Sequence, residues 1–145
     1  MTEAPFARYT QIAETLWVGG WPKEGVAPEF PRFIINLYPS GEYALRSYQQ
    51  SRAARIYDRF DELPDPALLH DLAENVTAWR AQGVVLVHCQ QGLNRSPLVV
   101  ALSLIKQGME PAAAIALLRE KRDPDVLFNP LFAAWLLQQG KDKAK

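Results

Sequence analysis

The chain has 145 residues, a length that fits one domain with a single hydrophobic core. It carries 16 basic and 16 acidic side chains, so the formal net charge is zero and no overall field favours nucleic acid or anionic lipid. No segment has the length needed to span a bilayer, and residues 1–8 lack the apolar core of a signal peptide. We therefore expect a cytoplasmic monomer that binds neither nucleic acid nor membranes.

Cys89 is the only cysteine, which excludes an internal disulfide and leaves one free thiol that a reducing compartment would preserve. Because only two histidines accompany this cysteine, the composition also disfavours a zinc site. We expect the protein to hold no metal and no cofactor.

The first half of the chain contains short apolar runs that predict strands. In chain order, strands are predicted at 15–18 and 32–37, a helix at 42–50, and a further strand at 54–57.

The second half of the chain is mostly helical in its pattern. A helix is predicted at 66–82, where apolar residues share one face, and a strand at 84–88 follows it. Three more helices are predicted at 96–107, 111–121 and 130–139; the last two begin with proline, which fits the first turn of a helix.

Alternating strands and helices, followed by a helical C-terminal half, predict an α/β fold. We expect a central sheet of four to five mostly parallel strands with helices on both faces. The continuous apolar run 84–87 is typical of a central strand buried on both sides. The pattern predicts one domain over residues 1–145, with a core at about 10–138 and a frayed tail at 140–145.

The segment that follows the predicted central strand contains the candidate residues of a reactive site. Cys89 ends the strand, and Arg95 and Ser96 follow after a short loop that contains Gly92. Loop N–H groups and a helix N-terminus attract a phosphate, and an arginine offers it two parallel hydrogen bonds that a lysine cannot reproduce. The residues predicted to bind the phosphate are Gln90, Gln91, Gly92, Leu93, Asn94 and Arg95.

The positive end of the helix dipole and the charge of Arg95 also favour the thiolate form of Cys89. A thiolate beneath a bound phosphate monoester is placed to displace the alcohol and form a cysteinyl-phosphate. We expect Ser96 to hydrogen-bond the sulfur and help it to leave in the second step. His88 is expected to order the loop and tune the sulfur.

The leaving oxygen needs a proton, which a carboxylic acid on an upstream loop supplies. Asp58 and Asp61 are the two candidates, since both lie where the predicted strand gives way to a loop. We favour Asp61, which lies past the strand and just before a turn with proline. Asp58 remains the alternative general acid, although it is also placed to pair with Arg55 or Arg59.

The sequence from His88 through Cys89 to Arg95 and Ser96 resembles the signature of the cysteine-dependent protein tyrosine phosphatases. The small size resembles their dual-specificity branch, and so do the segments 16–19, 34–37 and 119–132, so the resemblance covers roughly residues 10–138. It implies a phosphatase-like domain with a cysteine nucleophile and an arginine that binds phosphate. It further implies Ser96 as the partner of the sulfur, Asp61 or Asp58 as general acid, and Asn129 as a brace for the loop.

Substrate class is indicated by the loop residues Gln90, Gln91 and Leu93, which stand where inositol-lipid phosphatases of this kind usually have lysines. We therefore predict a protein phosphatase for phosphotyrosine, and the sequence leaves open whether phosphoserine and phosphothreonine are substrates too. The alternatives are a phosphatase for RNA 5′ ends or a small metabolite, a module that binds phosphate without hydrolysis, and a sulfur transferase or arsenate reductase.

Two further groups of residues have simpler interpretations. Arg119, Lys121 and Arg122 form a basic cluster that we interpret most simply as a solvated helix end. The alternative is that the cluster lies near the pocket and assists an anionic substrate. Tyr38 and Tyr43 lie in a predicted loop and are candidates for a wall of the pocket.

Overall fold

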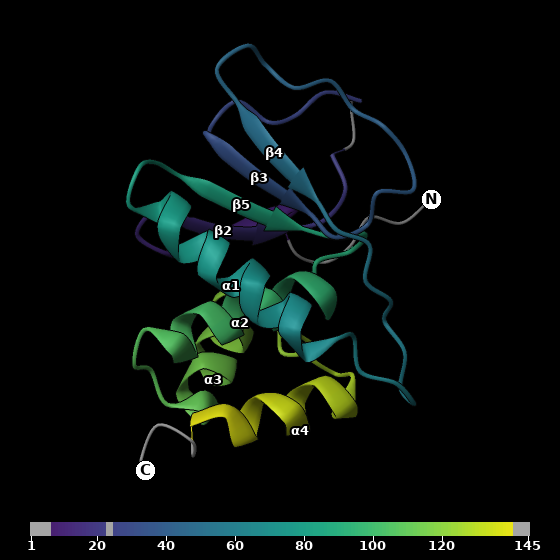
Figure 1. Ribbon diagram of the computed structural model, residues 1–145, viewed down its shortest axis with the longest axis vertical. Helices are drawn as coiled ribbons and strands as arrows, with labels where there is room; N and C mark the ends of the chain where they lie inside the picture. Colours follow the sequence, from purple (N-terminus) through teal and green to yellow (C-terminus); the bar gives the residue numbers. More distant parts are fainter. Residues whose placement is uncertain (1–6, 23–24, 141–145) are drawn as a thin grey trace.

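The computed structural model describes residues 7–22 and 25–140. Within these ranges the chain forms a five-stranded sheet and four helices (Figure 1). The strands are β1 (Tyr9–Ala13), β2 (Leu16–Gly19), β3 (Phe33–Asn36), β4 (Gln50–Ala53) and β5 (Val85–His88). The helices are α1 (Pro66–Arg80), α2 (Arg95–Lys106), α3 (Pro111–Lys121) and α4 (Pro130–Gln139).

The sheet has the strand order β1-β2-β5-β3-β4, so β5 lies at its centre. Strand β5 pairs in parallel with β2 and β3, and its last residue, His88, is in register with Gly19 and Asn36. Only β1 runs antiparallel, at one edge. The predicted α/β class and the mostly parallel sheet with a buried central strand are confirmed, and Cys89 directly follows the carboxyl end of that strand.

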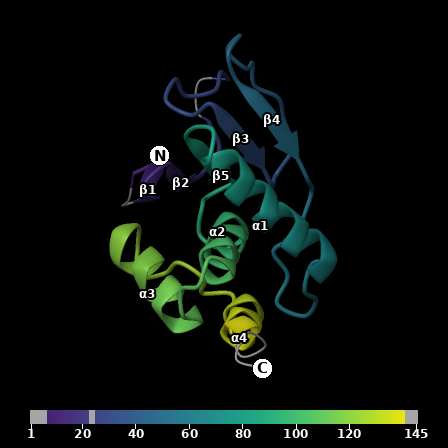
Figure 2. The ribbon, with the colours of Figure 1, turned by 60° about the vertical axis from the view of Figure 1, so that its left-hand side comes forward.

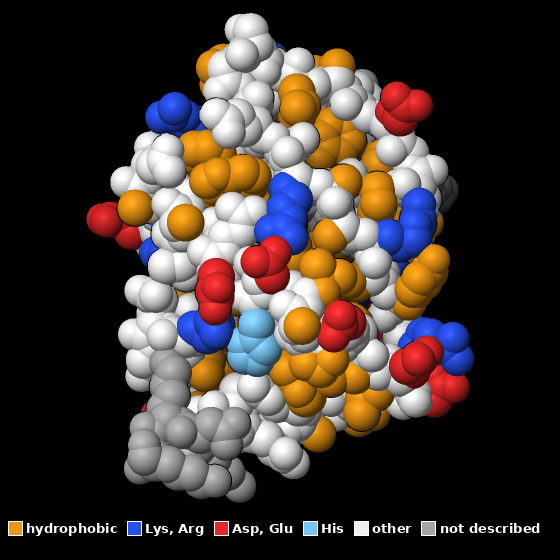
Figure 3. All heavy atoms as spheres, viewed as in Figure 1, with side chains coloured by type: hydrophobic (Ala, Val, Ile, Leu, Met, Phe, Trp, Pro, Cys, Tyr) orange, Lys and Arg blue, Asp and Glu red, His pale blue; other side chains and the backbone are white. Residues whose placement is uncertain are grey.

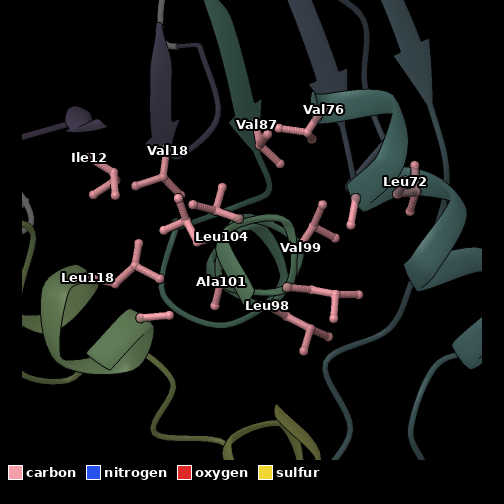
Figure 4. Packing of buried hydrophobic residues seen from close by; sticks show 14 of the residues in the cluster. Ile12, Val18, Leu72, Val76, Val87, Leu98, Val99, Ala101, Leu104 and Leu118 are labelled. Atoms are coloured by element: carbon pink, nitrogen blue, oxygen red, sulfur yellow. The ribbon is translucent and has the colours of Figure 1, made fainter. Parts of the chain in front are cut away.

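All four helices lie on one face of the sheet (Figure 2). Figure 4 shows Val18 of β2 and Val87 of β5 directed toward α2, with Leu72 of α1 and Leu118 of α3 around the same core. Helix α2 is therefore surrounded by apolar side chains and is buried along almost its whole length. We predicted helices on both faces of the sheet, and the structure differs from that part of the prediction.

The other face of the sheet is covered by the two connections on either side of β3. These connections are joined to each other by a parallel bridge between Val26 and Ala44. The ring of Phe30 packs at 4.4 Å on Trp17 of β2, and the ring of Tyr43 lies 5.4 Å from His88 of β5. Irregular segments with large side chains thus take the place that we predicted for a second layer of helices.

The predictions for two segments before α1 were wrong. Residues 42–50 form no helix, because Leu45 and Tyr48 are 41% and 53% exposed and the segment buries no apolar stripe. The strand predicted at 54–57 lies earlier, at Gln50–Ala53, where a polar sequence forms the edge strand of the sheet. Pairing with β3, which the local sequence does not encode, decides this position.

Helix prediction was accurate, because prolines and caps mark the helix starts. Helices α3 and α4 have the predicted bounds. Helix α1 begins as predicted and ends two residues earlier, and α2 begins and ends one residue earlier than predicted. Asp65 accepts a hydrogen bond from the N–H of Ala67 at the start of α1. Strand β1 was not predicted separately from β2, and the turn that divides them includes Thr15 at a φ of 61°.

The described residues share one hydrophobic core. Of the tail predicted to fray, Gly140 is described and 141–145 lie outside the described residues, as do residues 1–6. On the face in Figure 3, acidic and basic side chains are interspersed. None of the helices in the described ranges is both long and apolar enough to cross a membrane.

Candidate active site

A pocket of about 170 Å³ opens above the loop that joins β5 to α2. Its floor is at Cys89, and its walls come from that loop, from the segment before α1 and from the segment before α4. The lining residues are Asp58, Cys89, Gln90, Gln91, Leu93, Asn94, Arg95 and Phe128. The structure thus brings most of the residues predicted from the motif into one site.

Cys89 is almost fully buried, with 2% of the residue exposed, and its sulfur has two polar neighbours. The N–H of Gly92 donates to Sγ at 3.2 Å. The hydroxyl oxygen of Ser96 lies 3.3 Å from Sγ and 3.3 Å from the carbonyl oxygen of Gly19. Hydrogen bonds of this kind favour the charged form of a sulfur over the neutral form.

The loop offers hydrogen-bond donors that the protein itself leaves unused. The N–H groups of Gln91, Leu93 and Asn94 donate to none of the described residues. Asn94 occupies the N-cap position of α2, but its side chain does not cap the helix. A helix N-terminus and a loop with free N–H groups are a binding site for an anion.

Arg95 is held at the edge of the pocket with part of its donor capacity free. Its guanidinium lies over the ring of Tyr38, at 4.8 Å from the centroid, and Nη2 donates to Oε1 of Gln90 at 3.5 Å. Its Nε is buried and has no hydrogen-bond partner among the described residues. Because an unpaired buried donor is unfavourable, this group indicates a site that a ligand oxygen completes.

Asp58, not Asp61, lies in the pocket. Its carboxylate accepts hydrogen bonds from the side-chain amides of Asn94, at 2.9 Å, and Asn129, at 2.7 Å. Asp61 is exposed, binds Arg59 at 3.0 Å, and is absent from the residues that line the pocket. The bound Arg59 guanidinium holds the pKa of the Asp61 carboxyl below its usual range. The position that we favoured for the general acid therefore lies outside the pocket.

Asn129 ties the site together from the start of α4. Its Oδ1 caps the helix by accepting the N–H of Leu131 at 3.0 Å, and its own N–H donates to Oδ1 of Asn94 at 3.0 Å. Its side-chain amide also donates to the carbonyl oxygen of Arg59 at 2.9 Å. One side chain thus joins α4, the loop between β5 and α2, and the segment that carries Asp58.

His88 lies behind the loop and is fully buried. Tyr43 and His88 are hydrogen-bonded between Oη and Nε2 at 2.6 Å, and Nδ1 of His88 lies 3.2 Å from the carbonyl oxygen of Cys89. Burial raises the pKa of Tyr43 and lowers that of His88 to about 4, so both side chains are neutral near pH 7. With Tyr43 as donor, Nδ1 carries the proton and donates to the carbonyl oxygen of Cys89, which fixes the backbone at the start of the loop.

We expect the buried imidazole of His88 to make folding stability depend on pH. Its folded pKa of about 4 lies below the ordinary value of 6.5, so between these values the unfolded chain binds a proton that the folded chain does not. Stability is therefore complete above pH 6.5 and falls by up to about 3 kcal/mol as the pH approaches 4. Denaturant unfolding of the wild type and His88→Gln at several pH values measures this loss.

In His88→Gln, the slope of stability between pH 6.5 and 4 is expected to be shallower than in the wild type. His70→Gln is the matched control, because it removes the other histidine of the chain from a partly exposed position on α1. Equal slopes in His88→Gln and the wild type would show that other groups cause the acid sensitivity.

Arg122 is a functional candidate whose burial and contact with the loop were not predicted from the sequence. We interpreted it as part of a solvated helix end, but it is only 6% exposed and donates from Nε to the carbonyl oxygen of Gly92 at 2.8 Å. Burial lowers its pKa to about 10, so it stays charged near neutral pH. A basic residue just past a helix has no local pattern that distinguishes a buried position from an exposed one, so only the tertiary structure identifies it.

The comparison with protein families agrees with this geometry. The family model described as "Dual specificity phosphatase, catalytic domain" matches residues 48–142, which include the loop, Asp58 and Asn129. The chain belongs to this family. Like the fold, the family match supports the resemblance to the small dual-specificity branch of the cysteine-dependent phosphatases.

Curated relatives match this dual-specificity domain over shorter stretches. The PRL-1 phosphatase of Drosophila melanogaster is 46% identical over 41 residues, which are 28% of this chain and 23% of the relative. The probable protein tyrosine phosphatase type IVA B of Dictyostelium discoideum is 47% identical over 67 residues, 46% of this chain and 37% of the relative. The matched stretches thus span well under half of these relatives' lengths.

Solved structures match the fold along nearly the whole chain. The crystal structure of human DUSP28 has a TM-score of 0.78 and 22% identity, and the match covers 93% of this chain and 97% of that one. Within residues 7–22 and 25–140, no three His, Cys, Asp or Glu side chains form a group able to hold a metal ion.

Proposed function

We propose that this phosphatase domain hydrolyses phosphate monoesters, chiefly phosphotyrosine in proteins, through a cysteinyl-phosphate intermediate. One observation carries the proposal: the buried sulfur of Cys89 lies at the floor of a pocket in which Arg95 keeps an unpaired buried donor. Membership of the dual-specificity phosphatase family supports it. A reactive thiolate requires a reducing compartment, which supports a cytoplasmic location.

In the first step the loop N–H groups and Arg95 bind the phosphate oxygens above Cys89. The thiolate attacks phosphorus, an S–P bond forms, and the bond between phosphorus and the leaving oxygen breaks. Asp58 gives its proton to that oxygen. Each carboxyl oxygen of Asp58 accepts one amide N–H, and a second lone pair on one oxygen carries the proton before transfer.

In the second step, water attacks the phosphorus of the intermediate and the S–P bond breaks. Asp58, now a carboxylate, takes a proton from the water. The departing sulfur regains negative charge, which the N–H of Gly92 and the hydroxyl of Ser96 stabilise from 3.2 and 3.3 Å. The products are inorganic phosphate and the free thiolate.

Asp58→Asn is expected to lower kcat by about 10²-fold, because the amide cannot donate the proton to the leaving oxygen. The loss should be larger for alkyl phosphates than for p-nitrophenyl phosphate, whose leaving group needs less protonation. The variant should also lose the alkaline-side decline of the rate. Steady-state kinetics across pH with both kinds of substrate provide the measurement.

Asp61→Asn is the matched control for Asp58→Asn, since it makes the same chemical change on the same segment outside the pocket. It should keep kcat within about twofold, as expected of an exposed ion pair. A large loss of kcat in Asp61→Asn with little change in Asp58→Asn would show that Asp61, and not Asp58, is the general acid.

The rim of the pocket favours an aromatic leaving group. Phe128 lines the pocket and is 51% exposed, and Phe60 packs edge-on against it with ring centroids 5.9 Å apart. Exposed apolar rings at the mouth of a polar site offer a surface for a substrate ring. Gln90, Gln91 and Leu93 add no cation for a second phosphate, which supports a protein substrate over an inositol lipid.

The proposed function is tested with the wild-type protein and a panel of substrates. We expect the highest kcat/KM on phosphotyrosine peptides, lower values on phosphoserine and phosphothreonine peptides, and phosphoryl-Cys89 in acid-quenched samples analysed by mass spectrometry. A higher kcat/KM on an RNA 5′ phosphate or on a small phosphorylated metabolite would contradict the proposed protein substrate and identify that class of substrate in its place. Phosphopeptide binding without any turnover would indicate a recognition module, and thiosulfate or arsenate activity without phosphatase activity would exclude the proposal.

A further inference from the structure

The guanidinium of Arg122 lies on the far side of the phosphate-binding loop from the pocket. We propose that Arg122 is a positioning residue, which sets the direction of the loop peptides so that the N–H groups of Gly92 and Leu93 face the sulfur and the phosphate. The inference rests on the proposed function where it is tested by turnover of an aryl phosphate. It does not rest on that function where it is tested by the affinity for inorganic phosphate.

The argument begins with the two loop carbonyl groups that Arg122 binds. Nη2 donates to the carbonyl oxygen of Gln91 at 3.0 Å, and Nε donates to that of Gly92 at 2.8 Å. In a trans peptide the carbonyl oxygen and the following N–H point in opposite directions. Binding these two oxygens behind the loop therefore turns the N–H groups of Gly92 and Leu93 toward the pocket.

Both N–H groups fit this description. The N–H of Gly92 donates to Sγ of Cys89 at 3.2 Å, and that of Leu93 donates to none of the described residues. The first bond stabilises the thiolate, and the second group is free for a phosphate oxygen. Without a donor behind the loop, the two carbonyl oxygens would be free to rotate toward the pocket, where they repel an anion.

Arg122 is itself fixed by the edge of the sheet. Its Nη1 donates to the carbonyl oxygen of Ala7 at 2.9 Å and to Oγ1 of Thr10 at 2.8 Å, and Nη2 lies 3.3 Å from the carbonyl oxygen of Arg8. The side chain is 6% exposed, so water does not compete for these bonds. A guanidinium bound on both sides holds the loop against β1 as a rigid brace.

The residue type at position 92 agrees with this role. Gly92 has a φ of +76°, and a Cβ atom added there would lie 2.5 Å from Nη2 of Arg122 and 2.7 Å from the carbonyl oxygen of Gly19. A side chain at 92 would displace the guanidinium from the loop. The glycine thus permits both the left-handed turn and the close approach of Arg122.

The test compares Arg122→Lys and Arg122→Gln with Lys121→Gln, an exposed charge removed from the same helix end. Lysine keeps the charge, but its single ammonium cannot span the partners of a planar guanidinium. We expect the Kd for inorganic phosphate to rise about tenfold to hundredfold in both Arg122 variants, as for loss of a charge-assisted hydrogen bond. Lys121→Gln should match the wild type.

The kinetic readouts separate positioning from general support of the fold. In Arg122→Lys we expect kcat for an aryl phosphate to fall along with a rise in KM, and the pH profile of Cys89 alkylation by iodoacetamide to shift to higher pH. Gly92 and Ser96, which contact the sulfur, and Arg95 and Asp58, which line the same pocket, are retained in the variant. Lysine also keeps the positive charge that Arg122 places near Cys89, so a shift of the profile reports the position of the loop. Thermal unfolding is measured in parallel.

A fall in melting temperature with unchanged phosphate affinity and an unchanged alkylation profile would overturn the proposal, because Arg122 would then only stabilise the fold. If Arg122→Gln does not fold, Arg122→Lys decides alone. Wild-type protein that binds phosphate but fails to hydrolyse aryl phosphates would refute the proposed function, while the phosphate affinities of the variants would still test Arg122.

Discussion

Cys89→Ser is expected to reduce turnover of p-nitrophenyl phosphate by about 10⁴-fold or more while binding of inorganic phosphate persists. Serine keeps the size and the position of the side chain, but its hydroxyl is not ionised near neutral pH, so no S–P bond forms. The donors that hold the phosphate come from the loop and from Arg95, which the substitution leaves in place. Stopped assays for released phosphate and calorimetric titration with phosphate give the two values.

Ser96→Ala is the companion variant, because Ser96 contacts the same sulfur at 3.3 Å without supplying the nucleophile. It should form the cysteinyl-phosphate and hydrolyse it slowly, so that the intermediate accumulates. Turnover by Cys89→Ser at the wild-type rate would rule out the covalent mechanism. Loss of phosphate binding in Cys89→Ser would show that the thiolate itself shapes the pocket.

Arg95→Lys is expected to lower kcat/KM by about 10²- to 10³-fold through a higher KM and a lower kcat together. The guanidinium offers a planar pair of donors, and its Nε is the buried donor that the protein leaves unpaired. An ammonium replaces neither that geometry nor the contact of the guanidinium with the ring of Tyr38, 4.8 Å away. Steady-state kinetics with a phosphotyrosine peptide measure both parameters.

Arg55→Lys is the matched control for Arg95→Lys. Arg55 is an exposed arginine that binds Oγ of Ser40 and the carbonyl oxygen of Pro39 and does not line the pocket. It should keep kcat/KM within about twofold of the wild type. Arg95→Lys with near wild-type kinetics would remove Arg95 from the site.

The sequence was sufficient for those parts of the fold that local chemistry decides. Prolines at 111 and 130 and the helical spacing after them predicted α3 and α4 to the residue. The elements that hold the site were also predicted, because each has its own pattern. The apolar run 84–87 predicted the strand, the apolar residues of 96–107 predicted the helix, and the residues between Cys89 and Arg95 predicted the loop. The edge strand β4 was misplaced, since pairing with β3 and not its own polar sequence determines where it lies.

The parts of the site that sequence reasoning left open depend on contacts between distant segments. Asp58 lies in the pocket with Asn129 bound to it at 2.7 Å, a partner 71 residues away. Asp61 has a similar local context, so the sequence around it contains no information that separates the two. Arg122 is the same case, because its partners lie in the loop and in β1, far from its own helix.

The absence of helices from one face of the described sheet has a consequence for motion. Segments without regular hydrogen bonding open at a lower free energy than packed helices, so residues 25–32 and 37–49 of the β2–β3 and β3–β4 connections should exchange their amide hydrogens before α2 does. Tyr38 and Tyr43 lie in the second connection, and they contact Arg95 and His88 respectively. We therefore expect that a local opening on the face without helices removes the contacts of Tyr38 with Arg95 and of Tyr43 with His88 while the core around α2 stays folded, so that activity is lost before the fold is.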